Sequence, residues 1–122
     1  MKNLLFLFLL SIATLTGCAQ EDKKDILDVA NYKEVVVGKD VQLVDVRTPQ
    51  EYQAGYIDDA INIDFMNQET FNEAFEKLDK TKTLYIYCRS GNRSQKSVPL
   101  LKAMGFKEIY DLKGGYNAWS QK

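Results

Sequence analysis

The chain has no histidine, and this absence removes several common kinds of active site. Hydrolases that pair a serine or cysteine with a histidine base are excluded, and so are zinc sites built on imidazole ligands. A side chain that must be held as an anion in this protein therefore depends on backbone dipoles or on arginine and lysine.

An excess of charge of either sign is also missing. The sequence has 16 basic and 17 acidic residues, which give a formal net charge of -1. The two signs are interspersed, so there is no basic face for a phosphate backbone and no acidic tail, and nucleic acid is not an expected partner. With 122 residues, 45% of them hydrophobic, the chain fits one globular domain of common size.

The long apolar run of the chain is confined to its N-terminus. The stretch MKNLLFLFLLSIATLTGC begins with a basic residue and continues into an apolar segment that is too short to span a bilayer permanently. Residues 1–17 are therefore predicted to be an export signal. The segment Leu15–Cys18 resembles the lipobox of bacterial lipoproteins, which implies that Cys18 is acylated and becomes the mature N-terminus.

Lipidation at Cys18 would tether the protein to a membrane face in the cell envelope. The resemblance to such lipoproteins, with Ala19 rather than aspartate after the cysteine, implies the periplasmic face of the outer membrane if the cell is Gram-negative. The alternative is a simple secretory peptide with an incidental cysteine. The charged residues 18–28 are predicted to be a tether, and residues 29–122 to form the folded domain.

Cysteine is scarce, since the chain has only two. If Cys18 carries lipid, Cys88 is the remaining thiol and no intrachain disulfide can form. A lone thiol in an exported protein is a liability unless it is buried or used. An inert buried thiol is the alternative for Cys88, but the polar and basic residues that follow it in YIYCRSGNRS favour an ionisable one.

Apolar, β-rich segments alternate with segments of helical spacing along the domain. Strands are predicted at 41–46, 60–63, 83–88 and 108–112, and helices at 32–37, 49–54, 68–78, 93–104 and from 114 onward. Predicted helix signals are N-caps at Asn31 and Thr48, a C-cap at Gly105 and a kink at Pro99. This alternation predicts an α/β fold, an open and mostly parallel sheet with helices on both faces.

Ligands of such sheets bind outside the carboxyl ends of the strands. The segments VDVR and YIYCRSG both end there, so Asp45, Arg47 and Cys88 are expected to lie close together. The turn after Cys88 is tight, and Gly91 can supply the positive φ that it needs. Inward-pointing amides of this loop, the positive end of the next helix and two arginines are predicted to hold Cys88 as an accessible thiolate.

Three segments carry a family resemblance, namely VDVRTPQEYQAGYIDDAINI at 44–63, YCRSGNRS at 87–94 and LKGGYNAW at 112–119. These segments occur in order and cover nearly the whole predicted domain. In them the chain resembles the rhodanese-like family of sulfurtransferases, which implies that the sheet is five-stranded. One departure is visible, because the usual Gly-His-Ile-Pro is Gly-Tyr-Ile-Asp at 55–58, which affects local packing or partner contacts rather than the nucleophile.

The resemblance implies that Cys88 attacks the sulfane sulfur of a donor, becomes a persulfide and passes that sulfur to an acceptor. It implies no cofactor and no metal. The implied substrate-binding loop is Arg89, Ser90, Gly91, Asn92 and Arg93, with support from Asp45, Arg47 and Ser94. In related phosphatases of the same fold the loop between cysteine and arginine is one residue longer, so the spacing here favours sulfur transfer.

Several of these residues also have structural interpretations. Arg47 and Glu51 lie four positions apart and are predicted to form an ion pair beneath the site. Asp45 is expected to brace loops by accepting backbone N–H bonds. Arg89 and Arg93 have surface ion pairing as their alternative.

The LKGGYNAW segment has its own structural interpretation. The glycine pair at 114–115 is expected to form a tight helix start, and Trp119 is expected to anchor the core.

Two functions remain open. The first is an enzyme that moves sulfur from a small donor anion such as thiosulfate to a thiol, a thiol-bearing protein or cyanide. The second is a non-catalytic module that binds sulfur species or a partner protein through the same loop, and a small phosphatase is disfavoured by loop length. In either case the protein is expected to be a monomer that meets the membrane through its N-terminal lipid.

Overall fold

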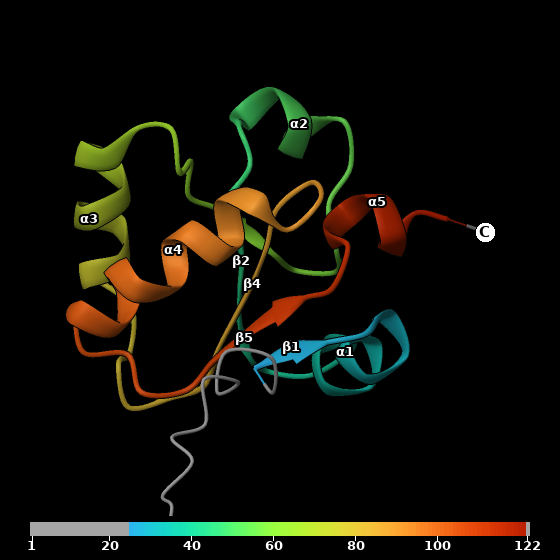
Figure 1. The fold of residues 1–122 in the computed structure, drawn as a ribbon, viewed down its shortest axis with the longest axis horizontal. Helices are drawn as coiled ribbons and strands as arrows, with labels where there is room; N and C mark the ends of the chain where they lie inside the picture. Colours follow the sequence, from blue (N-terminus) through green and yellow to red (C-terminus); the bar gives the residue numbers. More distant parts are fainter. Residues whose placement is uncertain (1–24, 122) are drawn as a thin grey trace, which may run out of the picture.

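The computed structural model describes residues 25–121, so the predicted export signal and Cys18 lie outside the described residues. Strands and helices alternate along this part of the chain (Figure 1). The strands are β1 (Ile26–Leu27), β2 (Gln42–Asp45), β3 (Ile61–Asn62), β4 (Leu84–Tyr87) and β5 (Ile109–Leu112). The helices are α1 (Val29–Val36), α2 (Pro49–Gln53), α3 (Gln68–Glu76), α4 (Asn92–Ala103) and α5 (Gly115–Trp119).

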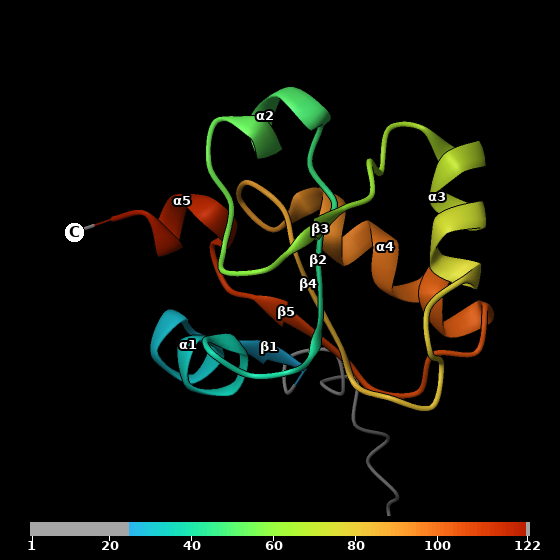
Figure 2. The same cartoon turned by 180° about the vertical axis from the view of Figure 1, so that it is seen from behind.

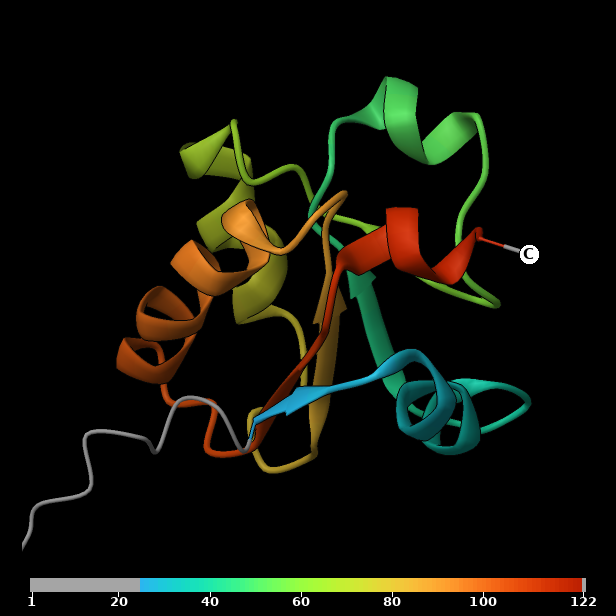
Figure 3. The ribbon, with the colours of Figure 1, turned by 45° about the vertical axis from the view of Figure 1, so that its right-hand side comes forward.

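The strands form one five-stranded sheet in the order β1-β5-β4-β2-β3, and every pairing is parallel. Helices α3 and α4 cover one face, while α1 and α5 cover the other (Figure 3). Each face has its own apolar cluster, one containing Phe71 and Phe75 of α3 and the other Tyr32 and Val36 of α1. The predicted fold class, an open parallel sheet with helices on both faces, is confirmed.

The folded part begins earlier than predicted. Ile26 and Leu27, which fall inside the predicted tether 18–28, pair with Asp111 and Leu112 of β5 as an edge strand. Leu27 also packs against the cluster beneath α1. The tether boundary at residue 28 was therefore wrong, because two apolar residues are too few to show a strand period and only the exposed edge of β5 gives them a partner.

The first helix also begins before its predicted start. Its N-cap is Asp28, whose Oδ1 accepts a hydrogen bond of 2.8 Å from the amide of Asn31, so the predicted cap residue is the donor and not the cap. The second predicted cap is confirmed. Thr48 and Glu51 form a reciprocal capping box at the start of α2, with Pro49 in its first turn.

Helix α4 continues through Pro99 and ends with Met104 as its C-cap, followed by Gly105 at φ +110°. The predicted C-cap at Gly105 is therefore one residue late, although Gly105 follows the cap in the left-handed conformation that glycine accepts. Pro99 lies inside α4, which continues to Ala103 and packs Leu101, two residues further on, into the core cluster of the α3 side. The kink at Pro99 stays a prediction.

The register of the sheet places the predicted site residues together. Asp45 of β2 pairs with Tyr87 of β4, so Arg47 and Cys88 both follow at the same carboxyl edge. Figure 2 shows α2 above this edge, next to the loop that joins β4 to α4. β5 lies on the other side of β4, with Asp111 paired to Ile86.

Candidate active site

Cys88 lies directly after β4 and is enclosed, with 1% of the residue exposed. Its Sγ accepts a hydrogen bond of 3.1 Å from the amide of Gly91 and lies 3.2 Å from Oγ of Ser94. Gly91 has φ +109°, which turns its N–H back toward the sulfur as α4 begins. The expected loop dipoles are therefore present, but the sulfur is neither exposed nor ringed by amides as predicted, because Gly91 is the one backbone donor to Sγ within residues 25–121.

Ser94, predicted as a supporting residue, is fully buried and connects three parts of the site. Its Oγ lies 3.2 Å from Sγ, 3.2 Å from the carbonyl oxygen of Gly91 and 2.9 Å from Oδ2 of Asp111. It belongs to the first turn of the 12-residue helix α4, whose positive end faces the loop. Ser94 thus joins the cysteine to a carboxylate on the neighbouring strand.

Asp111 is the residue that the sequence analysis missed. It is 1% exposed, and its carboxylate accepts hydrogen bonds from Ser94 Oγ, Gln95 Nε2 and the amide of Leu112. Burial raises the pKa of Asp111 from 3.8 to about 6, although these three donors oppose the shift. The available signal was a carboxylate inside the strand segment IYDL, whose other residues are isoleucine, tyrosine and leucine.

Arg93 pairs with Glu51 of α2. The guanidinium makes two hydrogen bonds to the carboxylate, at 2.7 and 3.0 Å. The predicted pair between Arg47 and Glu51 was wrong, because the sheet edge brings the start of α4 beside α2 and offers Glu51 a cation from another element. The alternative interpretation of Arg93 as an ion-pairing residue is the one that the structure shows.

Arg47 pairs instead with Asp45, and both side chains are buried. The Asp45 carboxylate accepts two hydrogen bonds from Arg47 Nε at 3.0 Å, one from its NH2 group at 2.6 Å and one from its backbone amide at 2.9 Å. The same NH2 group donates to the carbonyl of Gly55 at 2.7 Å, and the guanidinium lies 4.2 Å from the ring centre of Tyr116. The expected bracing role of Asp45 is confirmed.

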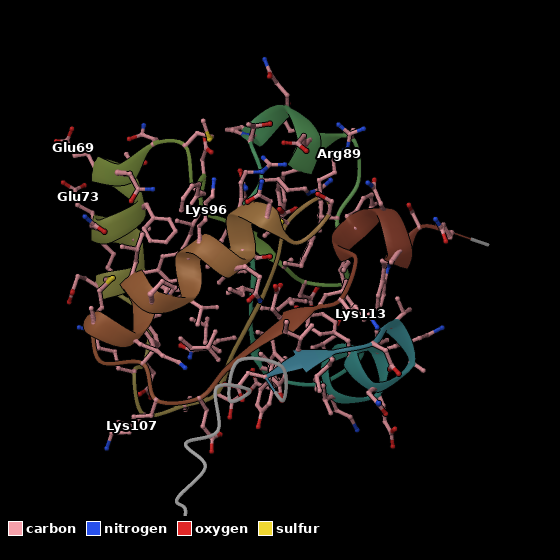
Figure 4. All side chains as sticks on the ribbon, in the orientation of Figure 1. Glu69, Glu73, Arg89, Lys96, Lys107 and Lys113 are labelled. Carbon is pink, nitrogen blue, oxygen red and sulfur yellow. The ribbon has the colours of Figure 1, made fainter. Side chains whose placement is uncertain are left out.

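A cleft of about 320 Å³ opens beside the loop, between α2 and α5. Arg89 is exposed at its edge, and Figure 4 shows this side chain between the two helices. Ser90 and Asn92 are exposed as well, so three of the five predicted loop residues face solvent. The lining residues are Arg47, Glu51, Ala54, Arg89, Tyr116, Asn117 and Ser120.

Helix α5 holds the other side of the loop through its first amides. Tyr116 N donates to the carbonyl of Cys88 at 2.8 Å, and Asn117 N donates to the carbonyl of Arg89 at 3.0 Å. Gly115 permits this approach, since a Cβ there would lie 2.5 Å from the Cys88 carbonyl oxygen. The predicted tight helix start is confirmed, with Gly114 as N-cap at φ +75°, and Trp119 packs against the apolar cluster beneath α1.

The segment that departs from the family pattern has a packing role here. The amide of Ile57 donates to the hydroxyl of buried Tyr87, and Tyr56 stacks on Tyr52 with ring centres 4.3 Å apart. Asp58 adopts φ +45°, and its carboxylate accepts from the amide of Gly38. The two departing residues, Tyr56 and Asp58, are both exposed, and none of these contacts involves the loop of Cys88.

Residues 25–121 contain no cluster of three or more acidic or cysteine side chains that could hold a metal ion. No helix among these residues is both long enough and apolar enough to cross a bilayer.

Known proteins resemble this chain over most of its length. The sequence model of the rhodanese-like domain matches residues 19–122. The thiosulfate sulfurtransferase GlpE of Coxiella burnetii is 34% identical over 86 residues, which cover 70% of this chain and 78% of that protein. The tRNA uridine(34) hydroxylase of Pelagibacter ubique is 33% identical over 97 residues, and this chain spans 32% of its length.

Solved structures give the same result for the fold. A rhodanese-like domain protein from Staphylococcus aureus aligns with a TM-score of 0.66 and 32% identity, covering 80% of this chain and 93% of that one. The human single-domain sulfurtransferase aligns with a TM-score of 0.67 over 80% of this chain and 98% of its own, and at 21% identity it supports the fold alone.

Proposed function

This chain belongs to the rhodanese-like domain family, and from this premise we propose that it is a sulfurtransferase that carries sulfane sulfur on Cys88. The observation that supports the proposal most directly is the setting of Sγ. The sulfur follows a central parallel strand, accepts a hydrogen bond from the amide of Gly91 and faces the first turn of α4. These groups favour a negative charge on sulfur, whether it belongs to a thiolate or to a persulfide.

The reaction consists of two displacements at sulfur. The Cys88 thiolate attacks the outer sulfur of thiosulfate, a new sulfur–sulfur bond forms, the bond inside thiosulfate breaks, and sulfite leaves with the electron pair. The resulting persulfide is then attacked at its terminal sulfur by an acceptor thiolate or by cyanide. That step gives an acceptor persulfide or thiocyanate and restores the Cys88 thiolate.

Access to the sulfur is part of the proposal, because Cys88 is enclosed. The cleft between α2 and α5 lies next to the loop, and Arg89 gives its rim a positive charge for a donor anion. Transfer then requires the exposed loop residues, Ser90 to Asn92, to move enough for the donor sulfur to reach Sγ. A loop of this kind, carried on a rigid sheet edge, is a common place for such motion.

The test is a comparison of the wild type with Cys88→Ser. Purified protein is incubated with thiosulfate and cyanide, and the formation of thiocyanate is followed. The wild type should turn over and the variant should not. Equal rates in the two proteins, or no turnover with any of several sulfane donors, would count against an enzyme.

A non-catalytic binding module is the second candidate, and the enclosed sulfur is the observation that favours it. Intact mass after treatment with a donor separates the two. A protein that gains the mass of one sulfur atom, and loses it on addition of a thiol, is relaying sulfur. A protein that binds the donor without this mass change is a binding module.

The location and partners are proposed on sequence grounds. We propose that Cys18 is lipidated, that residues 1–17 are removed, and that the protein works as a monomer in the cell envelope with a thiol or a thiol-bearing protein as acceptor. Intact mass of the membrane-extracted protein should show a lipid that Cys18→Ser lacks. Sedimentation of the soluble domain should give the mass of one chain.

A further inference from the structure

Three buried polar groups are linked in series: Cys88, which follows β4, Ser94 of α4 and Asp111 of β5. The Sγ-to-Oγ distance is 3.2 Å and the Oγ-to-Oδ2 distance is 2.9 Å. Each of the three residues is at most 1% exposed. This series begins at Sγ of Cys88 and ends on the carboxylate of Asp111, which the proposed sulfur-transfer steps do not use.

The serine hydroxyl has a single proton, so it cannot donate to both neighbours at once. When Asp111 is ionised, it can only accept, and Ser94 donates to it and offers its own oxygen to the S–H of Cys88. When Asp111 is protonated, it can donate to Ser94, which is then free to donate to a Cys88 thiolate. The direction of the two hydrogen bonds therefore follows the position of one shared proton.

The surroundings of Asp111 leave its carboxyl ready to hold that proton. Burial raises its pKa to about 6, and no Lys or Arg within residues 25–121 forms an ion pair with it. The other ionisable groups near it are the Tyr32 hydroxyl of α1, which donates to a backbone carbonyl, and the Asp25–Lys102 pair at 3.9 Å. None of these competes for the oxygen that faces Ser94.

We propose that Asp111 is the positioning residue that accepts the Cys88 proton, acting through the Ser94 hydroxyl. The S–H proton passes to Ser94 Oγ, and the hydroxyl proton of Ser94 passes to Oδ2 of Asp111. The net charge of the three groups stays at one negative unit, which moves from the carboxylate to the sulfur, where the Gly91 amide receives it. In a chain with no histidine, this carboxylate supplies the base.

Gln95 lies between Asp111 and a cavity beside α4. Gln95 donates to the same Oδ2 atom at 2.6 Å and lines a cavity of about 250 Å³ with Asp25, Val98, Pro99 and Lys102. A shift of the Gln95 side chain would connect Asp111 to this cavity. The proton can then leave on the side of α4 away from the cleft where the donor is proposed to bind.

The experiment measures the ionisation of Cys88 and of Asp111, using carbon NMR of the Cys88 Cβ and the Asp111 Cγ over a pH series. In the wild type both carbons should report the same two coupled steps. Asp111→Asn, which is nearly isosteric, should leave a single step at Cys88. It should also slow persulfide formation at neutral pH by about a hundredfold, which is the lower end of the range of rate enhancements that one positioned proton acceptor contributes.

Two further variants separate a relay from a structural role. Asp25→Asn removes a carboxylate at the same cavity that does not bond to Ser94, and it should keep both steps. Ser94→Ala should uncouple the two carbons, so that each follows its own titration. If Asp111→Asn lowers stability but leaves the Cys88 steps and the reaction rate unchanged, Asp111 is only structural and the proposal is overturned.

The relay matters biologically only if the proposed function holds, and the two can fail separately. The NMR titration needs no sulfur donor. Coupled titration steps in a protein that never gains a sulfur atom would support the relay and contradict the proposed sulfurtransferase. Turnover with uncoupled steps would do the opposite.

Discussion

Glu51 and Arg93, 42 positions apart, form a two-point ion pair between α2 and the start of α4. Glu51 is also held by Thr48 through the capping box of α2. The pair therefore fastens a short helix, which buries no side chain of its own, to the loop that carries Cys88. Its loss should be visible both in stability and in the shape of the cleft.

The first prediction concerns Glu51→Gln and its dependence on pH. Arg93 is the main reason that the pKa of Glu51 falls from 4.5 to about 2. A carboxylate with a lowered folded pKa stabilises the protein above its unfolded pKa, and this stability is lost as the pH falls through the folded pKa. The pair is partly exposed, so we expect the variant to lose about 1 kcal/mol at neutral pH.

Urea unfolding at several pH values measures this effect. The difference between wild type and variant should shrink as the pH falls from 4.5 toward about 2. Glu73→Gln is the matched control, because Glu73 is an exposed residue of α3 without an ion pair in the described structure. A variant effect that is the same at every pH would contradict the assignment.

The second prediction concerns the buried pair beneath the site. Asp45→Asn leaves the Arg47 guanidinium charged and only 5% exposed, so it should cost about 3–5 kcal/mol of unfolding free energy. Circular dichroism during urea unfolding measures the loss. The double variant with Arg47→Met should lose less than the sum of the two single variants, by about 2 kcal/mol, because neither charge is left alone. Additive losses would show that the two side chains act independently.

The third prediction compares two glycines that share a left-handed backbone. Gly38→Ala, at φ +69° with nothing within 4 Å of the added Cβ, should cost only the conformational strain of about 1 kcal/mol. Gly115→Ala adds a Cβ that would lie 2.5 Å from the Cys88 carbonyl oxygen, so it should cost about 3 kcal/mol and slow sulfur transfer. Thermal unfolding and thiocyanate formation measure the two effects. Equal effects at both positions would mean that α5 does not set the position of the loop.

The fourth prediction tests the rim of the cleft. Arg89→Ala should raise the KM for thiosulfate about tenfold and leave kcat nearly unchanged, because it removes one charge-assisted contact to the donor. Lys96→Ala is the control, because Lys96 is also an exposed cation but lies in α4 and does not line the cleft. This variant should change neither KM nor kcat. Steady-state kinetics of both variants decide the matter, and a fall in kcat alone for Arg89→Ala would place this residue in the chemical step instead.

Much of the fold followed from local signals. The capping box at Thr48 and Glu51, and the paired aromatics Phe71 and Phe75 of α3, depend on spacings of three and four residues that a sequence displays directly. The start of the fold at Ile26 did not follow, because two residues acquire a strand conformation only from pairing with β5. The cap at Asp28 was missed for a similar reason, since the helix was expected to start later.

In the candidate active site, too, some features could be predicted from the sequence and others could not. The sequence placed Cys88 at a strand end and Asp45 and Arg47 near it, because parallel strands bring their carboxyl ends to one edge. It could not choose the partner of Arg93, since two arginines and one glutamate allow more than one pairing. It also gave no reason to join Asp111 to Cys88, because that contact needs β5 beside β4 and Ser94 turned between them.

The sequence by itself determined the class of fold, the candidate nucleophile and the tight loop around it, because each depends on residue types at short spacing. The tertiary structure decided which charges neutralise one another, how deeply the sulfur lies and which carboxylate is linked to it through Ser94. These are contacts between residues far apart in the chain, and their energies depend on burial and direction, which exist only after the sheet has formed.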